Sequence, residues 1–168
     1  MISNIRRIAA AAAVTGVVAG ASALTAGVAT ANPSDVPCTA DDVTIAVTKD
    51  PGSGAGHEAF RIDYTAAGPH TNCKLQGAPT DVVFGISGRP LPGVEVTTTG
   101  DAANPVNLTA SSPAHSYLIQ ELAAEPNATV PSSIDFTLPS ADGSYARVAW
   151  PADGEIKNSL QATPVYES

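Results

Sequence analysis

Proline and glycine recur so often in this chain that they restrict what it can fold into. Each contributes 14 of the 168 residues, and strong helix formers are sparse beyond position 31. Proline removes a hydrogen bond from a helix interior, and glycine costs conformational entropy there. No long amphipathic helix can therefore be written outside the first 31 residues.

Short segments of strand-like sequence lie between these breaks. Large apolar residues alternate with smaller or polar ones over 43–48 and again over 60–65, which would place them on one face of a strand. Further candidate strands lie at 82–86, 94–96, 106–108, 115–122, 133–138, 145–150 and 161–166. Eight or nine short strands without helices predict an all-β fold, and specifically a single immunoglobulin-like antiparallel β-sandwich.

The N-terminal segment has the order of a cleavable export signal. Arg6 and Arg7 precede an uncharged run rich in Ala, Val and Gly, and Ala29-Thr30-Ala31 stands ahead of Asn32 and Pro33. We expect residues 1–31 to form a signal helix that is cleaved between Ala31 and Asn32. Residues 32–168 would then be one β-sandwich domain, secreted or held in the cell envelope. The run is too weakly hydrophobic for a stable membrane anchor.

The charge of the predicted mature domain excludes some partners. The whole chain has 8 basic and 16 acidic residues, and without Arg6 and Arg7 the formal net charge is −10. Such a surface repels phosphate backbones and anionic lipid headgroups, so we expect neither nucleic acid nor a membrane surface as partner. Cationic small molecules, metal ions and basic protein patches stay open.

Cys38 and Cys73 are the only two cysteines. Outside the cytoplasm they can be oxidised to one disulfide. That bond would close a loop containing the first two candidate strands and contribute about 3 to 4 kcal/mol by restricting the unfolded chain.

The histidines give only a weak indication of a metal site. His57, His70 and His115 could in principle converge with nearby carboxylates, but no two have the short spacing that places two ligands on one face. Loop histidines are the simpler interpretation, and we expect no metal and no cofactor. His57 ends a Gly-rich segment, 52–57, which lacks the Lys-Ser/Thr pair of a phosphate-binding loop.

A catalytic constellation is also missing from the sequence. The disulfide would consume both thiols, and Ser87 comes closest to a nucleophile motif although its surroundings predict a hairpin turn. Asp41 and Asp42 are adjacent, so on a strand they would point to opposite faces, and a solvated entrance to the following strand is the simpler interpretation. Trp150 is expected in the core. We therefore do not expect an enzyme.

Four motifs carry a resemblance to a known family. They are Cys38-Thr-Ala-Asp-Asp, Gly54-Ala-Gly-His57, Asn72-Cys73-Lys-Leu75-Gln-Gly77-Ala-Pro79 and Pro113-Ala-His-Ser-Tyr-Leu118. Through them the chain resembles an exported actinobacterial family, domain of unknown function 4232. The resemblance implies a β-sandwich in an envelope or extracellular setting and implies no reaction. Members commonly have two further cysteines toward the C-terminus, and here the region from Ser132 onward has none.

These observations lead to two functional hypotheses. The first is a non-enzymatic exported β-sandwich that binds an envelope or extracellular protein, or a cell-wall component, through loops at one end. The alternative is an exported protein that binds a small ligand or metal with the Gly-rich loop and the histidines. A broad apolar surface patch would favour the first, and a closed polar pocket beside His57 or His115 the second.

Overall fold

The structure is a computed structural model that describes residues 34–54, 56–100, 104–122 and 128–168. The predicted signal segment, with Ala31 and Asn32 at its cleavage site, lies outside these residues. Within them the fold is all-β, as predicted, with one short 3-10 helix. The elements are η1 (Ala40–Asp42), β1 (Val43–Asp50), β2 (His57–Ala66), β3 (Asn72–Leu75), β4 (Thr80–Ile86), β5 (Arg89–Pro90), β6 (Glu95–Thr98), β7 (Val106–Thr109), β8 (Ala114–Glu121), β9 (Ser133–Thr137), β10 (Tyr145–Ala149), β11 (Ser159–Ala162) and β12 (Tyr166–Glu167).

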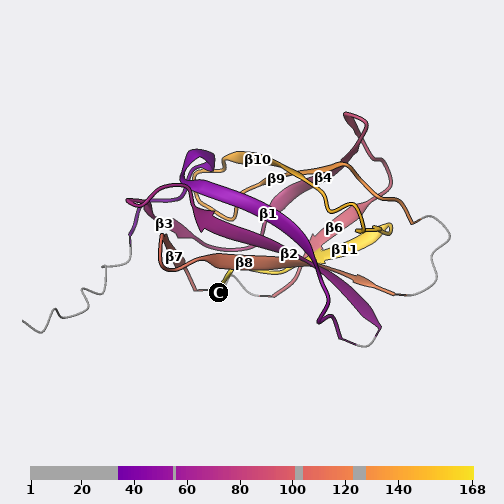
Figure 1. Cartoon of the computed structure of the whole chain (residues 1–168), viewed down its shortest axis with the longest axis horizontal. Helices are drawn as coiled ribbons and strands as arrows, with labels where there is room; N and C mark the ends of the chain where they lie inside the picture. The colour runs from indigo at the N-terminus through magenta and orange to yellow at the C-terminus, as the bar shows by residue number, and fades with distance from the viewer. Residues whose placement is uncertain (1–33, 55, 101–103, 123–127) are drawn as a thin grey trace, which may run out of the picture. The chain divides into compact units, whose positions relative to one another are not determined.

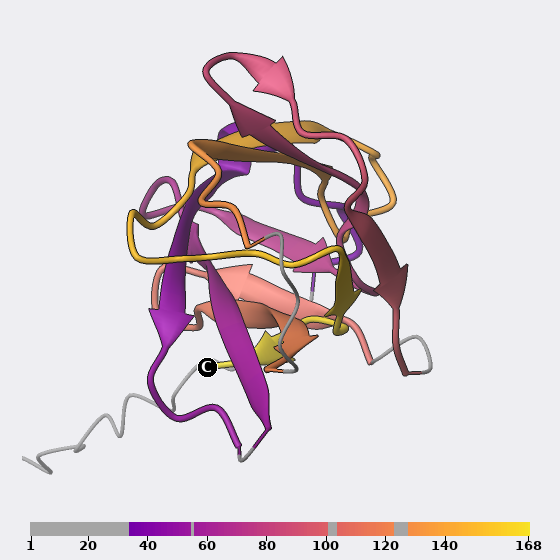
Figure 2. The ribbon, with the colours of Figure 1, turned by 90° about the vertical axis from the view of Figure 1, so that its right-hand side faces the viewer.

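The strands form two main sheets and one short ladder. The larger sheet has the order β1-β2-β8-β11-β6, and β12 also pairs with β8. The smaller sheet has the order β10-β9-β4-β5, and β3 pairs with β7. In Figure 1, β9, β10 and β4 lie above β1, β2 and β8, and Figure 2 shows the same layers from the end.

One strand pair departs from the antiparallel arrangement expected from the sequence. β11 runs parallel to β6, with Leu160 opposite Val96, whereas the other strand pairs of the described residues are antiparallel. Parallel neighbours need a long crossover connection, and the chain between β6 and β11 supplies one through β7 to β10.

The core lies between the two sheets. Phe60, Ile62 and Tyr64 of β2 are fully buried, and they share one hydrophobic cluster with Ile134 and Phe136 of β9. The large apolar residues whose alternation predicted β2 are therefore the residues on its buried face. The buried Tyr64 hydroxyl is hydrogen-bonded to the Ser116 hydroxyl at 3.0 Å, which satisfies both polar groups.

Trp150 is a core residue, as expected, and it contacts both sheets. Its ring centroid lies 4.5 Å from that of Phe60 in β2 and 5.1 Å from that of Phe84 in β4. The indole Nε1 donates a hydrogen bond to the Gly154 carbonyl at 2.7 Å. Burial of the ring thus leaves no unpaired donor.

Cys38 and Cys73 form the disulfide predicted from the presence of only two cysteines, with 4.9 Å between their Cα atoms. Both are buried. Backbone hydrogen bonds from Cys38 N to Lys74 O (3.0 Å) and from Lys74 N to Val36 O (2.8 Å) align the first described residues with β3. The bond therefore joins the start of the domain to β3 beyond the β1–β2 hairpin.

Two local features differ from the sequence prediction. The segment 161–166 is two short strands rather than one, because Pro164 between them has no N–H to donate. β3 was not predicted. Asp41 and Asp42 lie in η1, directly before β1, in agreement with the expected strand entrance, and Asp42 accepts hydrogen bonds from the Thr39 backbone N–H (2.9 Å) and hydroxyl (2.7 Å).

Candidate functional site

Side chains of the larger sheet that point away from the core form one surface, which we call the outer face. On β8 the buried positions alternate with partly exposed or exposed ones. Register places partly exposed or exposed residues of β2, β11 and β12 beside them. The outer face comprises His57, Arg61 and Asp63 of β2, His115, Tyr117, Ile119 and Glu121 of β8, Gln161 of β11 and Tyr166 of β12.

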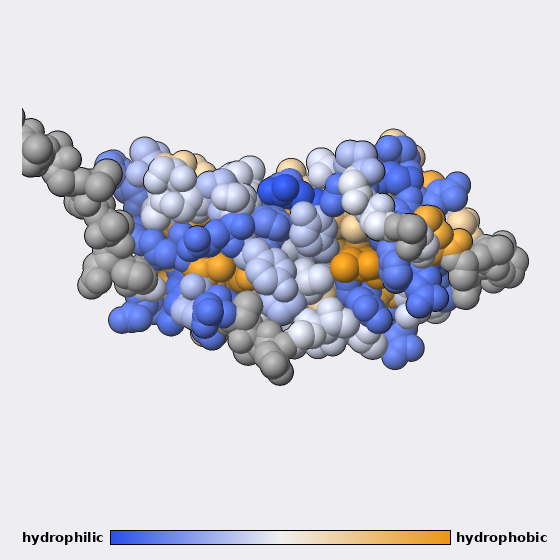
Figure 3. Space-filling view, turned by 90° about the horizontal axis from the view of Figure 1, so that it is seen from below, coloured by the Kyte–Doolittle hydropathy of each residue, from blue (hydrophilic) through white to orange (hydrophobic). Residues whose placement is uncertain are grey.

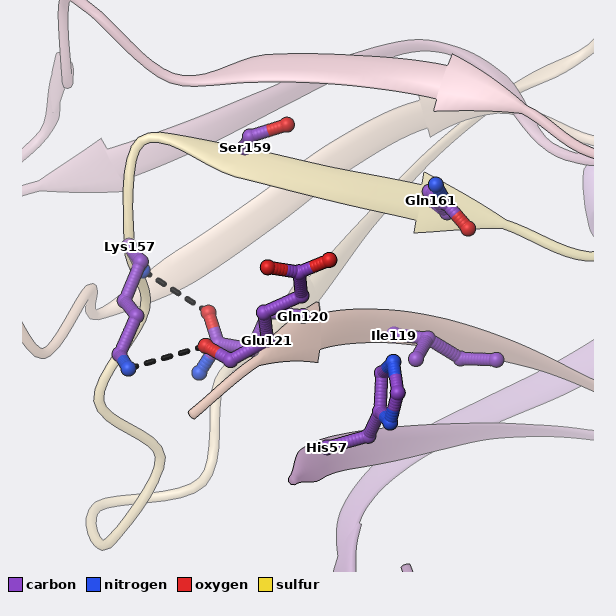
Figure 4. A pocket seen from close by; sticks show the side chains of 7 residues that line it. All are labelled: His57, Ile119, Gln120, Glu121, Lys157, Ser159 and Gln161. Atoms are coloured by element: carbon purple, nitrogen blue, oxygen red, sulfur yellow. Dashed lines mark hydrogen bonds between the residues drawn. The ribbon is translucent and has the colours of Figure 1, made fainter. Parts of the chain in front are cut away.

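A cavity of about 260 Å³ lies at one end of this face, and we call it the His57 trough. It is lined by His57, Ile119, Gln120, Glu121, Lys157, Ser159 and Gln161 (Figure 4). His57, which begins β2, is paired with Glu121, which ends β8, and Ile119 is paired with Gln161. A second cavity shares His57, Ile119 and Gln161 with the trough and is also lined by Ser53 and Gly54 of the β1–β2 loop.

Gln120 is the structural anchor beneath the trough. It is only 3% exposed, and its amide nitrogen donates to Glu58 Oε2 and to the Glu155 carbonyl, both at 2.7 Å. Its amide oxygen accepts from the Lys157 backbone N–H at 2.9 Å. These bonds hold the segment before β11 against the end of β8 (Figure 4).

Two charged side chains beside Gln120, Glu58 and Lys157, have polar partners. Glu58 forms an ion pair with Lys49, and the Lys157 ammonium group donates to the Glu121 carbonyl at 2.9 Å. Burial alone would raise the pKa of Glu58, but hydrogen bonds from Lys49 and Gln120 outweigh it and hold the pKa below its ordinary value. Glu58 is therefore an anionic support of the trough wall, with no sign of a group poised to exchange protons near neutral pH.

Three rings gather at the other end of the outer face, and we call them the ring cluster. The His115 ring lies 5.2 Å from that of Tyr117 and 6.1 Å from that of Tyr166, measured between centroids. Arg61 is paired with Tyr117 and Asp63 with His115 across the β2–β8 ladder. The ring cluster is thus flanked by a cation and an anion on the adjacent strand.

Polar contacts hold the ring cluster and its flank in place. Arg61 Nε donates to Asp63 Oδ1 at 2.7 Å, and Arg61 Nη2 donates to the Ser168 hydroxyl at 3.2 Å. His115 Nδ1 lies 2.9 Å from the same hydroxyl. Burial lowers the pKa of His115, the charge of Arg61 lowers it further, and Asp63 partly opposes both. His115 is therefore neutral at neutral pH.

The structure does not bring the three histidines together. His57 of β2 is opposite Glu121 at the end of β8, whereas His115 lies six positions before Glu121 on β8. At the rise of a β-strand, these six positions place His115 and His57 about 20 Å apart. His70 is exposed in the turn between β2 and β3. Among residues 34–54, 56–100, 104–122 and 128–168, no three His, Cys, Asp or Glu side chains group as metal ligands would.

The other segments considered for chemistry are turns. Ser87 has a φ of 49° in the β4–β5 hairpin and is exposed, in line with the turn predicted there. The Gly-rich segment is part of the β1–β2 loop, in which the His57 backbone N–H donates to the Gly54 carbonyl at 3.0 Å.

Most of the outer face was not predicted from the sequence, although the alternation of residues in one strand indicated part of it. The odd-numbered residues of the predicted strand 115–122 share one face, which would have joined His115 and Tyr117 to Ile119. The contributions of Gln161 and Tyr166 depend on which strands are neighbours in the sheet. That order has no local signal in the sequence.

These features define an all-β domain with one disulfide and an open sheet face that is both aromatic and polar. Residues 38–166 match the family model described as Domain of unknown function (DUF4232), and the chain belongs to this family. Comparison with curated proteins found no match, and comparison with solved structures found none either. In the described part of the chain, no helix has the length and hydrophobicity needed to span a bilayer.

Proposed function

We propose that this protein is an exported, non-catalytic binding domain that uses its outer face to hold an envelope or extracellular partner, either a protein or a cell-wall component. The observation that carries the proposal is the ring cluster on an open sheet face. The chain has few aromatic residues, and all three Phe and the single Trp are in the core. Two of its four Tyr lie with His115 on the outer face instead.

The large exposed apolar residues of the described chain are scattered and do not provide the broad apolar patch expected to favour a binding domain, so the proposal depends on the ring cluster. Figure 3, a view from below Figure 1, shows hydrophobic residues as separate patches framed by hydrophilic ones. The large exposed apolar residues belong to several different elements: Val36, Val83, Ile86, Leu122, Val130, Tyr145 and Tyr166. Recognition would then depend on rings and hydrogen bonds and take place on the sheet face, not on end loops alone.

Export is part of the same proposal. The leader 1–31, cleaved after Ala31, would deliver the domain to an oxidising compartment, and the buried Cys38–Cys73 bond fits that setting. The resemblance adds an actinobacterial origin and a family pattern in which a second cysteine pair is usual and here missing.

We also propose that the two sheets form an immunoglobulin-like sandwich, and the strand orders support it. β1-β2-β8 corresponds to the A-B-E order of that fold, and β10-β9-β4-β5 corresponds to G-F-C-C′. β11 takes the position beside the E strand where a D strand would be expected. The disulfide and Trp150 occupy different places from those in antibody domains.

A second candidate function is small-ligand binding in the His57 trough. The trough is polar and is lined by His57, and its volume of about 260 Å³ is slightly below the usual range of ligand pockets, which suits only a small ligand. Glu121, Ser159 and Gln161 would supply hydrogen bonds to such a ligand. The separation of the histidines favours an organic ligand over a metal ion.

The proposal is tested by retention on an envelope fraction of the source organism. We expect the purified protein to be retained, and Tyr117→Thr and Tyr166→Thr to reduce retention while the melting temperature stays close to that of the parent. Tyr145→Thr is the matched control, because Tyr145 is 56% exposed but belongs to the smaller sheet. Equal retention of all four proteins would contradict the proposal. A small molecule released from the pure protein, with no envelope retention, would favour the second candidate.

A further inference from the structure

We infer that the outer face binds a carbohydrate chain whose sugar units are uncharged. The inference rests on the proposed function and names the chemistry of its partner. It is carried by the combination of the ring cluster, the adjoining Arg61–Asp63 pair and the His57 trough on one continuous face.

The ring cluster offers surfaces suited to sugar rings. A pyranose presents an apolar C–H face and a rim of hydroxyl groups, so it needs an aromatic surface with hydrogen-bonding groups beside it. Tyrosine has an apolar ring and a polar tip, which suits a partner of that kind. Tyr166 is 46% exposed, and Tyr117 and His115 are partly exposed next to it.

The flank of the ring cluster supplies the hydrogen bonds. The Arg61 guanidinium has five N–H groups, and its bonds to Asp63 and Ser168 account for two of them. Both side chains of the ion pair are about one-third exposed. Since Arg61 and Asp63 orient each other, less conformational entropy is lost when they bind vicinal hydroxyl groups.

The length of the face favours a chain over a single sugar. From His115 to Glu121 the outward side chains of β8 extend over six positions, about 20 Å. Ile119, the next outward residue of β8 after Tyr117, already lines the His57 trough, where Ser159 and Gln161 offer further hydroxyl and amide groups. The face is an open track with hydrogen-bonding groups at both ends.

Charge selects among carbohydrates. The predicted mature domain has a formal net charge of −10, and the cations along this face stand next to carboxylates, with Arg61 bonded to Asp63 and Lys157 lining the trough together with Glu121. Uronic acid polymers and phosphate-containing polymers would be repelled. Tyrosine and arginine also occur in protein–protein hot spots, so a protein partner is the outcome that protease treatment of the envelope fraction distinguishes.

The inference is tested by calorimetric titration of the purified protein. The probes are linear hexasaccharides of N-acetylglucosamine and of glucose, with polygalacturonate as the anionic comparison. We expect at least one neutral hexasaccharide to bind more tightly than its monosaccharide, and Tyr117→Thr and Tyr166→Thr each to weaken binding by about fivefold or more. Tyr145→Thr should bind like the parent. Binding of neither neutral probe, tighter binding of polygalacturonate, or equal loss in the Tyr145 variant would overturn the inference.

A second measurement separates failure of this inference from failure of the proposed function. The envelope fraction is treated with protease before the retention assay. Retention that survives the treatment and still depends on Tyr117 and Tyr166 supports a carbohydrate partner. Retention that depends on these residues but is abolished by protease keeps the binding function and rejects carbohydrate. No retention before treatment rejects the binding function itself.

Discussion

Replacing Gln120 with Ala should destabilise the domain, because this buried amide joins three parts of the fold. Its side chain bonds to Glu58 in β2 and to the backbone of Glu155 and Lys157 before β11. Truncation removes all three hydrogen bonds, so the Glu155 carbonyl and the Lys157 backbone N–H lose their bonds to Gln120. The side chain is only 3% exposed, so water does not reach it readily in the intact fold.

The size of the effect follows from the number of bonds lost. At about 1 kcal/mol for each hydrogen bond, the loss is about 3 kcal/mol. An unfolding entropy of about 2.1 cal/mol/K per residue over the roughly 137 residues after the leader converts this to about 10 °C in melting temperature. Lost packing around the side chain adds to the effect.

Urea denaturation followed by Trp150 fluorescence measures the change. Gln120→Met keeps the length of the side chain but cannot make the hydrogen bonds, so it should also be clearly less stable than the parent. Gln161→Ala, an exposed position on β11, should change stability by no more than about 0.5 kcal/mol. If Gln120→Ala were no less stable than Gln161→Ala, the assigned role of the buried amide would be refuted.

Three further predictions concern the disulfide, the pH dependence and the leader. Replacing Cys38 and Cys73 with Ala should lower the free energy of unfolding by about 3.8 kcal/mol, the chain-entropy value for a separation of 35 residues, measured by urea denaturation; an unchanged midpoint would contradict it. The pKa of His115 is lower in the folded protein than in the unfolded chain, so the unfolded chain binds a proton at His115 more readily. The contribution of neutral His115 to the free energy of unfolding is therefore complete above the ordinary histidine pKa and is lost as pH falls below it. Between pH 7 and 5 the parent should therefore lose more stability than His115→Gln, and parallel thermal-melt curves would count against this. Mass spectrometry of the exported protein should show Asn32 as its first residue, and an intact leader would reject the predicted cleavage after Ala31.

The part of the fold predicted from the sequence is the part with a local signal. Alternating apolar residues marked β1 and β2 because one face of each strand is buried in the core. Pro164 could have indicated the break between β11 and β12, since proline cannot donate a ladder hydrogen bond. β3 was missed because its alternation extends over only the four residues Asn72–Leu75.

Strand order was beyond the sequence for a physical reason. The parallel pairing of β6 with β11 joins segments more than 60 positions apart, and it depends on how the sheets close around the core. The same limitation applies to the candidate site. His57 and His115 were identified as residues of interest, but their grouping with Gln161 and with Tyr166 comes from neighbouring strands.

Backbone amide NMR of the isotope-labelled protein during titration with its envelope partner tests the central claim most directly. The account predicts that chemical-shift changes concentrate on β8, β11 and β12, at Tyr117, Ile119, Gln161 and Tyr166, and spare Tyr145 on β10. Changes confined to the smaller sheet, with the outer face unaffected, would contradict it.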